Sequence, residues 1–145
     1  MHVRDIMTKN PVCCGPDTSV QAAAKLMDAN DCGEIPVLDK DGVPLGVITD
    51  RDIACRCVAH GMTHETRVSD IMSSPVVTVT IDTSISDCCA KMEENQIRHV
   101  PVVDEAGKCC GMVSQADIAL GSDTQNTGQL VRDMSKPSHD PSHEN

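Results

Sequence analysis

The sequence has no phenylalanine, tyrosine or tryptophan among its 145 residues. Without aromatic rings, a core must be packed from aliphatic side chains, methionine and cysteine, and a flat ligand must be held without aromatic stacking. Basic residues are also scarce, because 12 Lys and Arg stand against 22 Asp and Glu, which gives a net charge of −10. No basic stripe of the kind that binds nucleic acids or anionic membranes is present, so we expect neither partner.

Long apolar runs and an export signal are missing as well. The chain turns polar directly after Met1, and no apolar run approaches the length that spans a membrane. We therefore expect a soluble, cytoplasmic protein. Nine cysteines, an odd number, do not indicate a disulfide framework in such a chain, and we expect most of them to be reduced thiols.

What the sequence does contain is an internal repeat. Residues 3–7 (VRDIM) return as residues 68–72 (VSDIM), and three further segments return in the same order. These pairs are 17–19 with 82–84, 35–39 with 100–104, and 46–53 with 111–118. Each copy alone, about 60 residues, is small for a stable core, so we expect the two copies to pack together about a pseudo-twofold axis and to bind a ligand between them.

Each copy predicts the order strand, helix, strand, strand, helix, which gives an α/β (α+β) fold of two β-α-β-β-α units. Apolar residues recur at helical spacing in both copies. These are Val20, Ala23, Ala24 and Met27 after a cap at Thr18 or Ser19, and Ile85, Cys88, Cys89 and Met92 after 83–84. Other expected elements are extended stretches at 11–14 and 76–79, hairpins over 35–48 and 100–113, helices over 50 to about 60 and 115–120, and helical turns at 3–7 and 68–72.

The repeat divides the chain into a first unit at 1–60, a linker at 61–67 and a second unit at 68–121. Residues 122–145 are rich in polar residues, and we expect most of them to form a flexible tail. Within this tail, residues 130–134 (LVRDM) resemble the opening segment and are expected to dock as a short helix.

The junction between the last strand and the last helix of each copy carries the most suggestive polar residues. Free N–H groups at a helix start favour anions, the Thr49 hydroxyl could bind a phosphate oxygen, and the Asp52 carboxylate could accept ribose hydroxyls. Arg51 adds a charged donor, and Ser114 and Asp117 repeat the pattern in the second copy. The same spacing is also that of a capping box, which needs no ligand, so both interpretations stay open.

Taken in order, residues 5–7, 35–39 and 46–53, with their second copies, resemble the CBS motif, named after cystathionine β-synthase. The pair resembles the two-motif regulatory unit often called a Bateman module. This resemblance implies two units packed through their sheets, with clefts that bind AMP, ADP, ATP, NAD or S-adenosylmethionine. It also implies ribose contacts from Asp52 and Asp117, phosphate contacts from Thr49 and Ser114, and pocket walls at Ile35, Pro36, Val100 and Pro101.

The two clefts are not expected to be equal. In the family, basic residues before the second proline reach phosphates held by the first copy, and here these positions are Arg98 and His99. The matching positions for the other cleft are Gly33 and Glu34, and a carboxylate near phosphate is unfavourable. We therefore expect a phosphate-bearing nucleotide at Thr49 and Asp52, and a weaker, uncharged or absent ligand at Ser114 and Asp117. Alternatively, Arg98 and His99 are an ordinary exposed pair.

The leading functional prediction is a non-enzymatic nucleotide sensor that requires no cofactor, acts as a homodimer and passes its signal to an unidentified protein target. Catalysis is not expected, because the sequence shows no glycine-rich phosphate loop or hydrolase signature, and Cys57 with His60 has no evident orienting acid. A thiol- or metal-responsive protein is the alternative, with Cys55, Cys57, His60 and His64 as candidate ligands. Their spacing matches no standard zinc pattern, so no metal site is predicted.

The remaining cysteines have simpler expectations. Cys88 and Cys89 replace two alanines of the first copy and are expected to act as small core residues. Two adjacent pairs, at 13–14 and 109–110, lie at strand edges, where one cysteine of each pair should point inward. Disulfides between adjacent cysteines are strained, so none is predicted.

Overall fold

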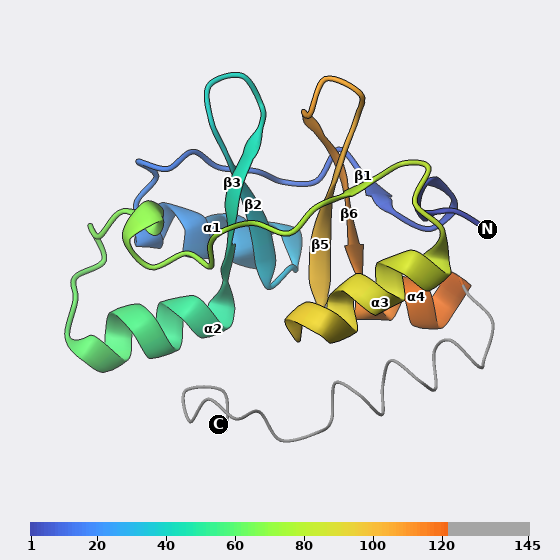
Figure 1. Ribbon diagram of the computed structural model, residues 1–145. Helices are drawn as coiled ribbons and strands as arrows, with labels where there is room; N and C mark the ends of the chain where they lie inside the picture. The colour runs from blue at the N-terminus through green and yellow to red at the C-terminus, as the bar shows by residue number, and fades with distance from the viewer. Residues whose placement is uncertain (122–145) are drawn as a thin grey trace.

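The computed structural model describes residues 1–121, so the flexible tail and the short helix expected at 130–134 lie outside the described residues. The chain forms the expected mixed α+β fold from two similar units, whose hairpins stand side by side in Figure 1. The first unit contains α1 (Val20–Asn30), β2 (Glu34–Leu38), β3 (Pro44–Thr49) and α2 (Asp50–Asp52). The second contains α3 (Ile85–Asn95), β5 (His99–Val103), β6 (Cys109–Ser114) and α4 (Gln115–Gly121).

Helices α1 and α3 begin at serine caps and bury one face each. The Ser19 hydroxyl accepts a bond from Ala22 N at 3.1 Å, and the Ser84 hydroxyl accepts one from Asp87 N at 3.0 Å. The expected apolar faces are buried, except that Ala24 is only partly covered. These faces pack against the hairpins to form one apolar core in each unit.

The helix expected over residues 50 to about 60 is less regular than predicted. After α2 the chain makes a π-helical turn at Ile53–Cys57 and a 3-10 turn at Val58–His60, and it ends at Gly61 with φ of +71°. A π-helical turn is wider than an α-helical turn, which changes the faces that successive residues share. Here Cys57 is buried in the first core, whereas His60 is exposed.

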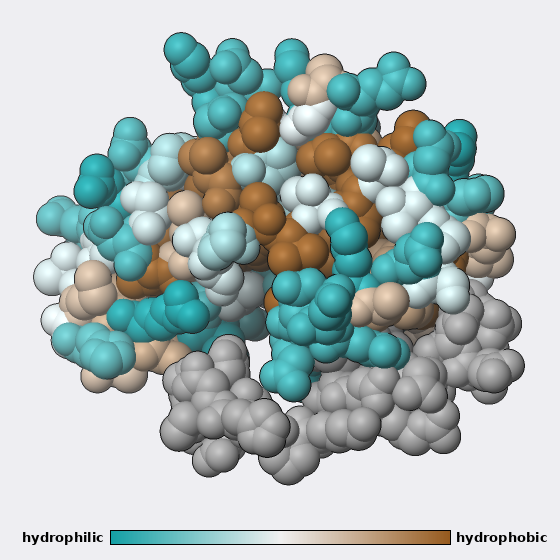
Figure 2. Space-filling view, viewed as in Figure 1, coloured by the Kyte–Doolittle hydropathy of each residue, from teal (hydrophilic) through white to brown (hydrophobic). Residues whose placement is uncertain are grey.

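Each hairpin is antiparallel, and the two touch at their tips. Ile35 lies opposite Ile48 in the first hairpin, and Val100 lies opposite Val113 in the second. Cys109 N donates to the Gly42 carbonyl at 2.9 Å, which joins the turn of the first hairpin to the second. Apolar residues gather in the middle of the face seen in Figure 2, over these two hairpins, with hydrophilic residues around them.

The segment that precedes each unit packs on the other unit. The 3-10 turn Val3–Asp5 leads into β1 (Thr8–Lys9), which pairs with β6 and makes the four-stranded sheet β1-β6-β5-β4. The matching turn Val68–Asp70 leads to Ser73, which exchanges two backbone bonds with Val47 of the first hairpin, at 2.9 and 3.2 Å. We call residues 3–9 and 68–73 the lead segments. Figure 1 shows the N-terminus beside the second unit as a result.

Two glycines make room for the lead segments. A methyl group added at Gly46 would lie 2.7 Å from the Ser73 carbonyl oxygen, and one at Gly111 would lie 2.6 Å from Met7 Sδ. These contacts are closer than carbon can approach, so the bare backbone at both positions lets the crossing segment lie flat on the hairpin. The glycine that begins both residues 46–53 and residues 111–118 is therefore needed for the lead segment to pack on the hairpin.

The strands before the first helices are shorter than predicted. In residues 11–14 only Cys14 pairs, through an isolated bridge to Val37, and residues 76–79 contribute only to β4 (Val79–Thr80), which runs parallel to β5. Strand β1 was not predicted, because Thr8 and Lys9 carry no strand pattern of their own. Within residues 1–121, no helix is long and apolar enough to cross a membrane.

A substitution at Val3 tests whether the first lead segment packs on the second unit. It is fully buried in the second core although it lies near a chain end, where residues usually fray. We expect Val3→Ala to lower the free energy of unfolding by about 1–3 kcal/mol, because it removes two buried methyl groups and leaves a cavity. Urea unfolding followed by far-ultraviolet circular dichroism measures this. Val58→Ala is the control, since Val58 is 67% exposed; an equally small effect at both positions would contradict the packing.

Candidate functional site

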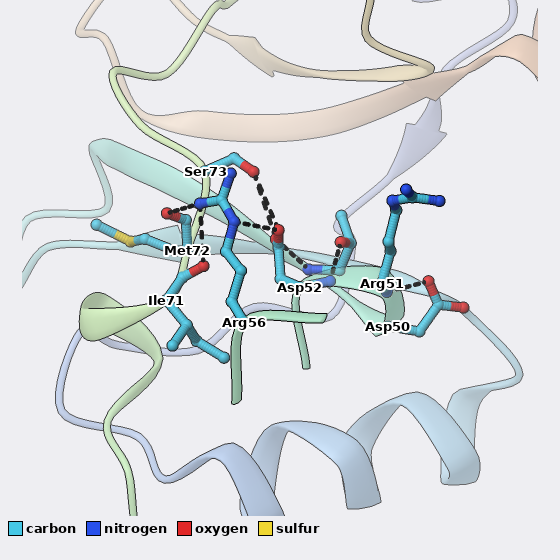
Figure 3. Close-up of polar contacts among 8 residues, drawn as sticks. Asp50, Arg51, Asp52, Arg56, Ile71, Met72 and Ser73 are labelled. Atoms are coloured by element: carbon cyan, nitrogen blue, oxygen red, sulfur yellow. Dashed lines mark hydrogen bonds and ion pairs between the residues drawn. The ribbon is translucent and has the colours of Figure 1, made fainter. Parts of the chain in front are cut away.

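The first junction places Thr49 and Asp52 in a reciprocal pair of hydrogen bonds. Asp52 N donates to Thr49 Oγ1 at 3.0 Å, and Thr49 N donates to Asp52 Oδ2 at 3.0 Å. This is the capping box that the spacing predicts as one of two interpretations. It fixes the hydroxyl and the carboxylate at the point where β3 becomes α2, as Figure 3 shows.

The Asp52 carboxylate also contacts the second lead segment. Its oxygens lie 3.4 Å from the Ser73 hydroxyl, and Oδ1 lies 3.6 Å from Arg56 Nε. Arg56 Nη1 in turn donates to the carbonyls of Ile71 and Met72, at 3.4 and 3.3 Å. Asp52 is only 7% exposed, and these donors supply hydrogen-bonding partners for its buried carboxylate. Sequence reasoning missed Arg56, although its i,i+4 spacing from Asp52 could have indicated the ion pair.

The second junction repeats the capping box but not the arginine. Asp117 N donates to Ser114 Oγ at 3.1 Å, and Ser114 N donates to Asp117 Oδ2 at 2.9 Å. The position that corresponds to Arg56 is Gly121. Across the described residues 1–121, Asp117 forms no ion pair, so this carboxylate has no cation of its own. We call the two junctions the Thr49/Asp52 site and the Ser114/Asp117 site.

Capping leaves both sites with unused hydrogen-bonding capacity. A hydroxyl that accepts a bond from a backbone N–H keeps its own proton, which it can donate to a phosphate oxygen. An ionised carboxylate offers about four acceptor positions, and the cap uses one of them. At Asp52 the Ser73 hydroxyl and Arg56 Nε also approach these oxygens, so fewer positions stay open there. The capping and ligand interpretations therefore use different parts of the same groups and do not exclude each other.

His99 lies near the Thr49/Asp52 site, although it comes from the second hairpin. Burial lowers the pKa of its imidazole below the ordinary value, while the nearby carboxylates of Asp52 and Asp50 raise it and the Arg98 guanidinium lowers it further. Arg98 itself is exposed, and its carbonyl accepts a bond from Gln115 N at 2.8 Å. The structure thus places His99 within electrostatic reach of the first junction's carboxylates and of the Arg98 guanidinium.

Glu34 occupies the position in the first hairpin that corresponds to His99 in the second. Its side chain is acidic, whereas that of His99 is basic. Burial raises the pKa of its carboxyl group, and the carboxylates of Asp50 and Asp117 raise it further. Glu34 therefore lies within electrostatic reach of the Ser114/Asp117 site. The neighbouring Gly33 carbonyl accepts a bond from Asp50 N at 2.9 Å, as the Arg98 carbonyl does in the other unit. His99 therefore interacts with the carboxylates of the first junction, whereas Glu34 interacts with a carboxylate of each junction, Asp50 and Asp117.

The other predicted site residues are either buried in the cores or exposed on the surface. Ile35 and Val100 are fully buried in the two cores, and Pro36 and Pro101 are buried beside them. Their prediction as pocket walls stays a prediction. Arg51 is exposed, and its backbone N–H donates to Asp50 Oδ1 at 2.8 Å, while its side chain extends away from that carboxylate in Figure 3.

The candidate metal ligands do not come together. Cys57 is buried, with its thiol 3.6 Å from the Thr63 carbonyl oxygen, while His60 and His64 are exposed. In the part of the chain that the structure describes, no three His, Cys, Asp or Glu residues are grouped so that they could hold a metal ion.

Comparison with known proteins gives the family of this fold. The family model of the CBS domain matches residues 3–57 and 68–121. Hypoxic response protein 1 of Mycobacterium tuberculosis is 33% identical over 135 residues, which cover 92% of this chain and 94% of that protein. A crystal structure of Hypoxic Response Protein I with two coordinated zinc ions superimposes with a TM-score of 0.78 at 33% identity, covering 85% of this chain and all of that one.

Two further solved structures contain adenosyl ligands. The CBS domain pair of protein MJ0100, in complex with 5'-methylthioadenosine and S-adenosyl-L-methionine, has a TM-score of 0.75 and 30% identity, covering 83% of this chain and 94% of that one. CBSX2 in complex with AMP has a TM-score of 0.70 and 27% identity, covering 82% and 93%. With both repeats matched by the same family model and by solved domain pairs, the chain belongs to the CBS domain family and carries two CBS domains in tandem.

Proposed function

We propose that this protein is a non-enzymatic regulatory module that binds an adenosine-containing ligand at the Thr49/Asp52 site. The observation that carries the proposal is the capped junction, where a hydroxyl proton and carboxylate acceptor positions remain available beside His99 and Arg98. Related CBS domain pairs bind such ligands, namely AMP in CBSX2 and S-adenosyl-L-methionine in MJ0100. No cofactor is required for binding alone.

The charges around the two sites favour phosphate at only one of them. His99 interacts with the Asp50 and Asp52 carboxylates of the Thr49/Asp52 site, and Arg98 precedes it in the chain. Glu34 interacts with Asp50 and also with Asp117, so the Ser114/Asp117 site meets a carboxylate and no comparable histidine. A phosphate beside Glu34 would meet like-charge repulsion in a partly buried setting, where screening is weak. The Ser114/Asp117 site would therefore take a weaker or uncharged adenosyl ligand, or none.

A bound ligand that contacts both repeats would be able to transmit a signal. The Thr49/Asp52 site combines β3 and α2 of the first repeat, the second lead segment at Ser73, and His99 of the second hairpin. A ligand held by all of these parts favours the relative packing in which they are closest together. Such differential affinity is how a binding module transmits a signal, here to a target protein or to a second copy of the chain.

A ligand panel tests the proposal directly. We expect AMP, ADP or ATP to raise the melting temperature by about 5 °C or more at one hundred times the dissociation constant, because binding at that level stabilises the fold by about 2.7 kcal/mol. Calorimetry or an extrinsic dye can report melting, whereas intrinsic fluorescence cannot, since the chain has no Phe, Tyr or Trp. NAD, S-adenosylmethionine and adenosine complete the panel, and no shift with any of them would refute the proposal.

Arg98→Gln and Glu34→Gln separate the two sites. Loss of one charge-assisted hydrogen bond to phosphate should weaken AMP binding about tenfold in Arg98→Gln, with little change for adenosine. Glu34→Gln should leave AMP affinity unchanged or higher, because it removes a repelling charge. Isothermal titration calorimetry measures both. If Glu34→Gln weakened AMP binding more than Arg98→Gln, the assignment of phosphate to the Thr49/Asp52 site would be wrong.

His99 should take up a proton when phosphate binds. Without ligand its pKa lies below the ordinary value, so it is mostly neutral at pH 7. A phosphate nearby favours the charged form and raises that pKa, so AMP affinity should increase as the pH falls from about 7 towards 6. Calorimetry in buffers of different ionisation enthalpy measures proton uptake. His99→Gln is the control for titration of AMP itself, and the same uptake in this variant would exclude His99.

We further propose that two copies associate through the face shown in Figure 2. Apolar residues gather on this face over the two hairpins. Leu45 of β3, in the first hairpin, is 37% exposed. Large exposed apolar patches commonly mark protein interfaces. Light scattering coupled to size exclusion should give twice the mass of one chain, and Leu45→Glu should shift the protein towards monomers. A monomeric wild-type protein at micromolar concentration would contradict this.

A further inference from the structure

Arg56 lies between the buried carboxylate of the first junction and the second lead segment. Its Nε lies 3.6 Å from Asp52 Oδ1, and its Nη1 donates to the Ile71 and Met72 carbonyls at 3.4 and 3.3 Å. Figure 3 shows both sets of contacts. One planar guanidinium therefore contacts the carboxylate and the lead segment at the same time, which a single point charge cannot do as well.

The carboxylate that Arg56 contacts lies beside the proposed phosphate donor. Thr49 offers its hydroxyl to the phosphate, and its backbone N–H donates to Asp52 Oδ2 at 3.0 Å. Asp52 is only 7% exposed, so water screens its charge poorly. A phosphate at Thr49 is therefore repelled by this carboxylate unless a positive charge lies close to it. Arg56 supplies that charge, because a guanidinium stays protonated in proteins.

The segment that binds the Arg56 guanidinium is itself fixed in place. Ser73, which follows the two accepting carbonyls, exchanges backbone bonds with Val47 at 2.9 and 3.2 Å. Ile71 is 3% exposed and packs in the first core. The carbonyls therefore hold the guanidinium beside Asp52, although the arginine side chain is 50% exposed.

The second junction has no room for such an arginine. Gly121 corresponds to Arg56, and a methyl group added there would lie 2.4 Å from Ile6 Cγ2 and 3.2 Å from Ile6 Cβ. The first distance is far shorter than two carbon atoms can approach, so a side chain at this position requires Ile6 to move. Ile6 belongs to the first lead segment and corresponds to Ile71 of the second. One lead segment thus binds an arginine through its backbone, whereas the other packs its side chain where that arginine would begin.

We propose that Arg56 is a specificity-determining residue that allows an anionic adenosyl ligand to bind beside Asp52. This inference rests on the proposed function and specifies the charge of the ligand. The Arg56 guanidinium balances the Asp52 carboxylate, so a phosphate at Thr49 meets a less negative site. Within residues 1–121, Asp117 of the second junction forms no ion pair, so an uncharged ligand is favoured there.

Two ligands that differ in charge test the inference on the full chain. In Arg56→Gln, AMP should bind about tenfold more weakly, because a positive charge close to a partly buried phosphate has been removed. Adenosine should stay within about twofold of the wild type, because it carries no phosphate for that charge to attract. The loss for AMP should become smaller as sodium chloride is added, since salt screens a half-exposed charge. Isothermal titration calorimetry at constant pH measures these affinities.

Two further variants provide the matched comparison. Arg67→Gln removes the same charge from another exposed arginine, which pairs with Asp17 and Asp70 at 3.5 and 3.6 Å, and it should leave the affinity for both ligands unchanged. Arg56→Lys keeps the positive charge but loses the forked contact with the lead segment. It should therefore retain most of the affinity for AMP, whereas a purely structural role of the carbonyl contacts would be lost in Arg56→Lys as in Arg56→Gln.

The outcomes separate this inference from the proposed function. If Arg56→Gln left AMP affinity unchanged, or weakened AMP and adenosine equally, the role of Arg56 would be refuted while the nucleotide site remained. An equal loss of AMP affinity in Arg67→Gln, or in Arg56→Lys, would refute it as well. If the wild type bound neither AMP nor adenosine, the proposed function would be wrong, and this inference with it. Far-ultraviolet circular dichroism checks that each variant is folded, and Arg56→Lys keeps the test decisive if Arg56→Gln is not.

Discussion

The structure depends on the reciprocal packing of the two lead segments. Val3 completes the core of the second repeat, and Val68 completes the core of the first. Both are fully buried, and neither contributes to the hairpin or helices of its own repeat. In a chain without aromatic residues, each core consists of small aliphatic and sulfur-containing side chains, so the loss of one valine leaves a gap that no large neighbour fills. The crossing therefore makes the pair of repeats, and not one repeat, the unit that folds.

The same crossing builds the proposed Thr49/Asp52 site. Ser73 reaches Asp52 because the second lead segment lies along β3, and Arg56 is held by carbonyls of that segment. The capped strand-to-helix junction then presents its hydroxyl and carboxylate without further rearrangement, which lowers the entropic cost of binding. The two repeats share a backbone but differ in charge, since the residue at the start of the second hairpin is His99, near Asp52 and Asp50, and the matching residue of the first hairpin is Glu34, near Asp50 and Asp117. A duplicated fold can in this way offer two sites of different chemistry.

Much of this was predictable from local patterns, and the rest required the tertiary structure. The repeat, the helix faces at Val20 and Ile85, the hairpins and the capped junctions all follow from residues close together in the sequence. Strand β1 was missed because Thr8 and Lys9 form a strand only by adding to β6 of the other repeat. The contact between Ser73 and Asp52 likewise joins segments far apart in the sequence. Gly46 and Gly111 were visible in the sequence, but their packing partner was not.

The exchanged lead segments also constrain the order of events during synthesis. The first lead segment leaves the ribosome about 100 residues before its partner strand β6 (Cys109–Ser114). The first repeat, for its part, cannot close its core until Val68 has been made. Neither half can therefore be finished as an independent nascent domain, and Met7 and its apolar neighbours stay uncovered until nearly the whole duplication has been translated.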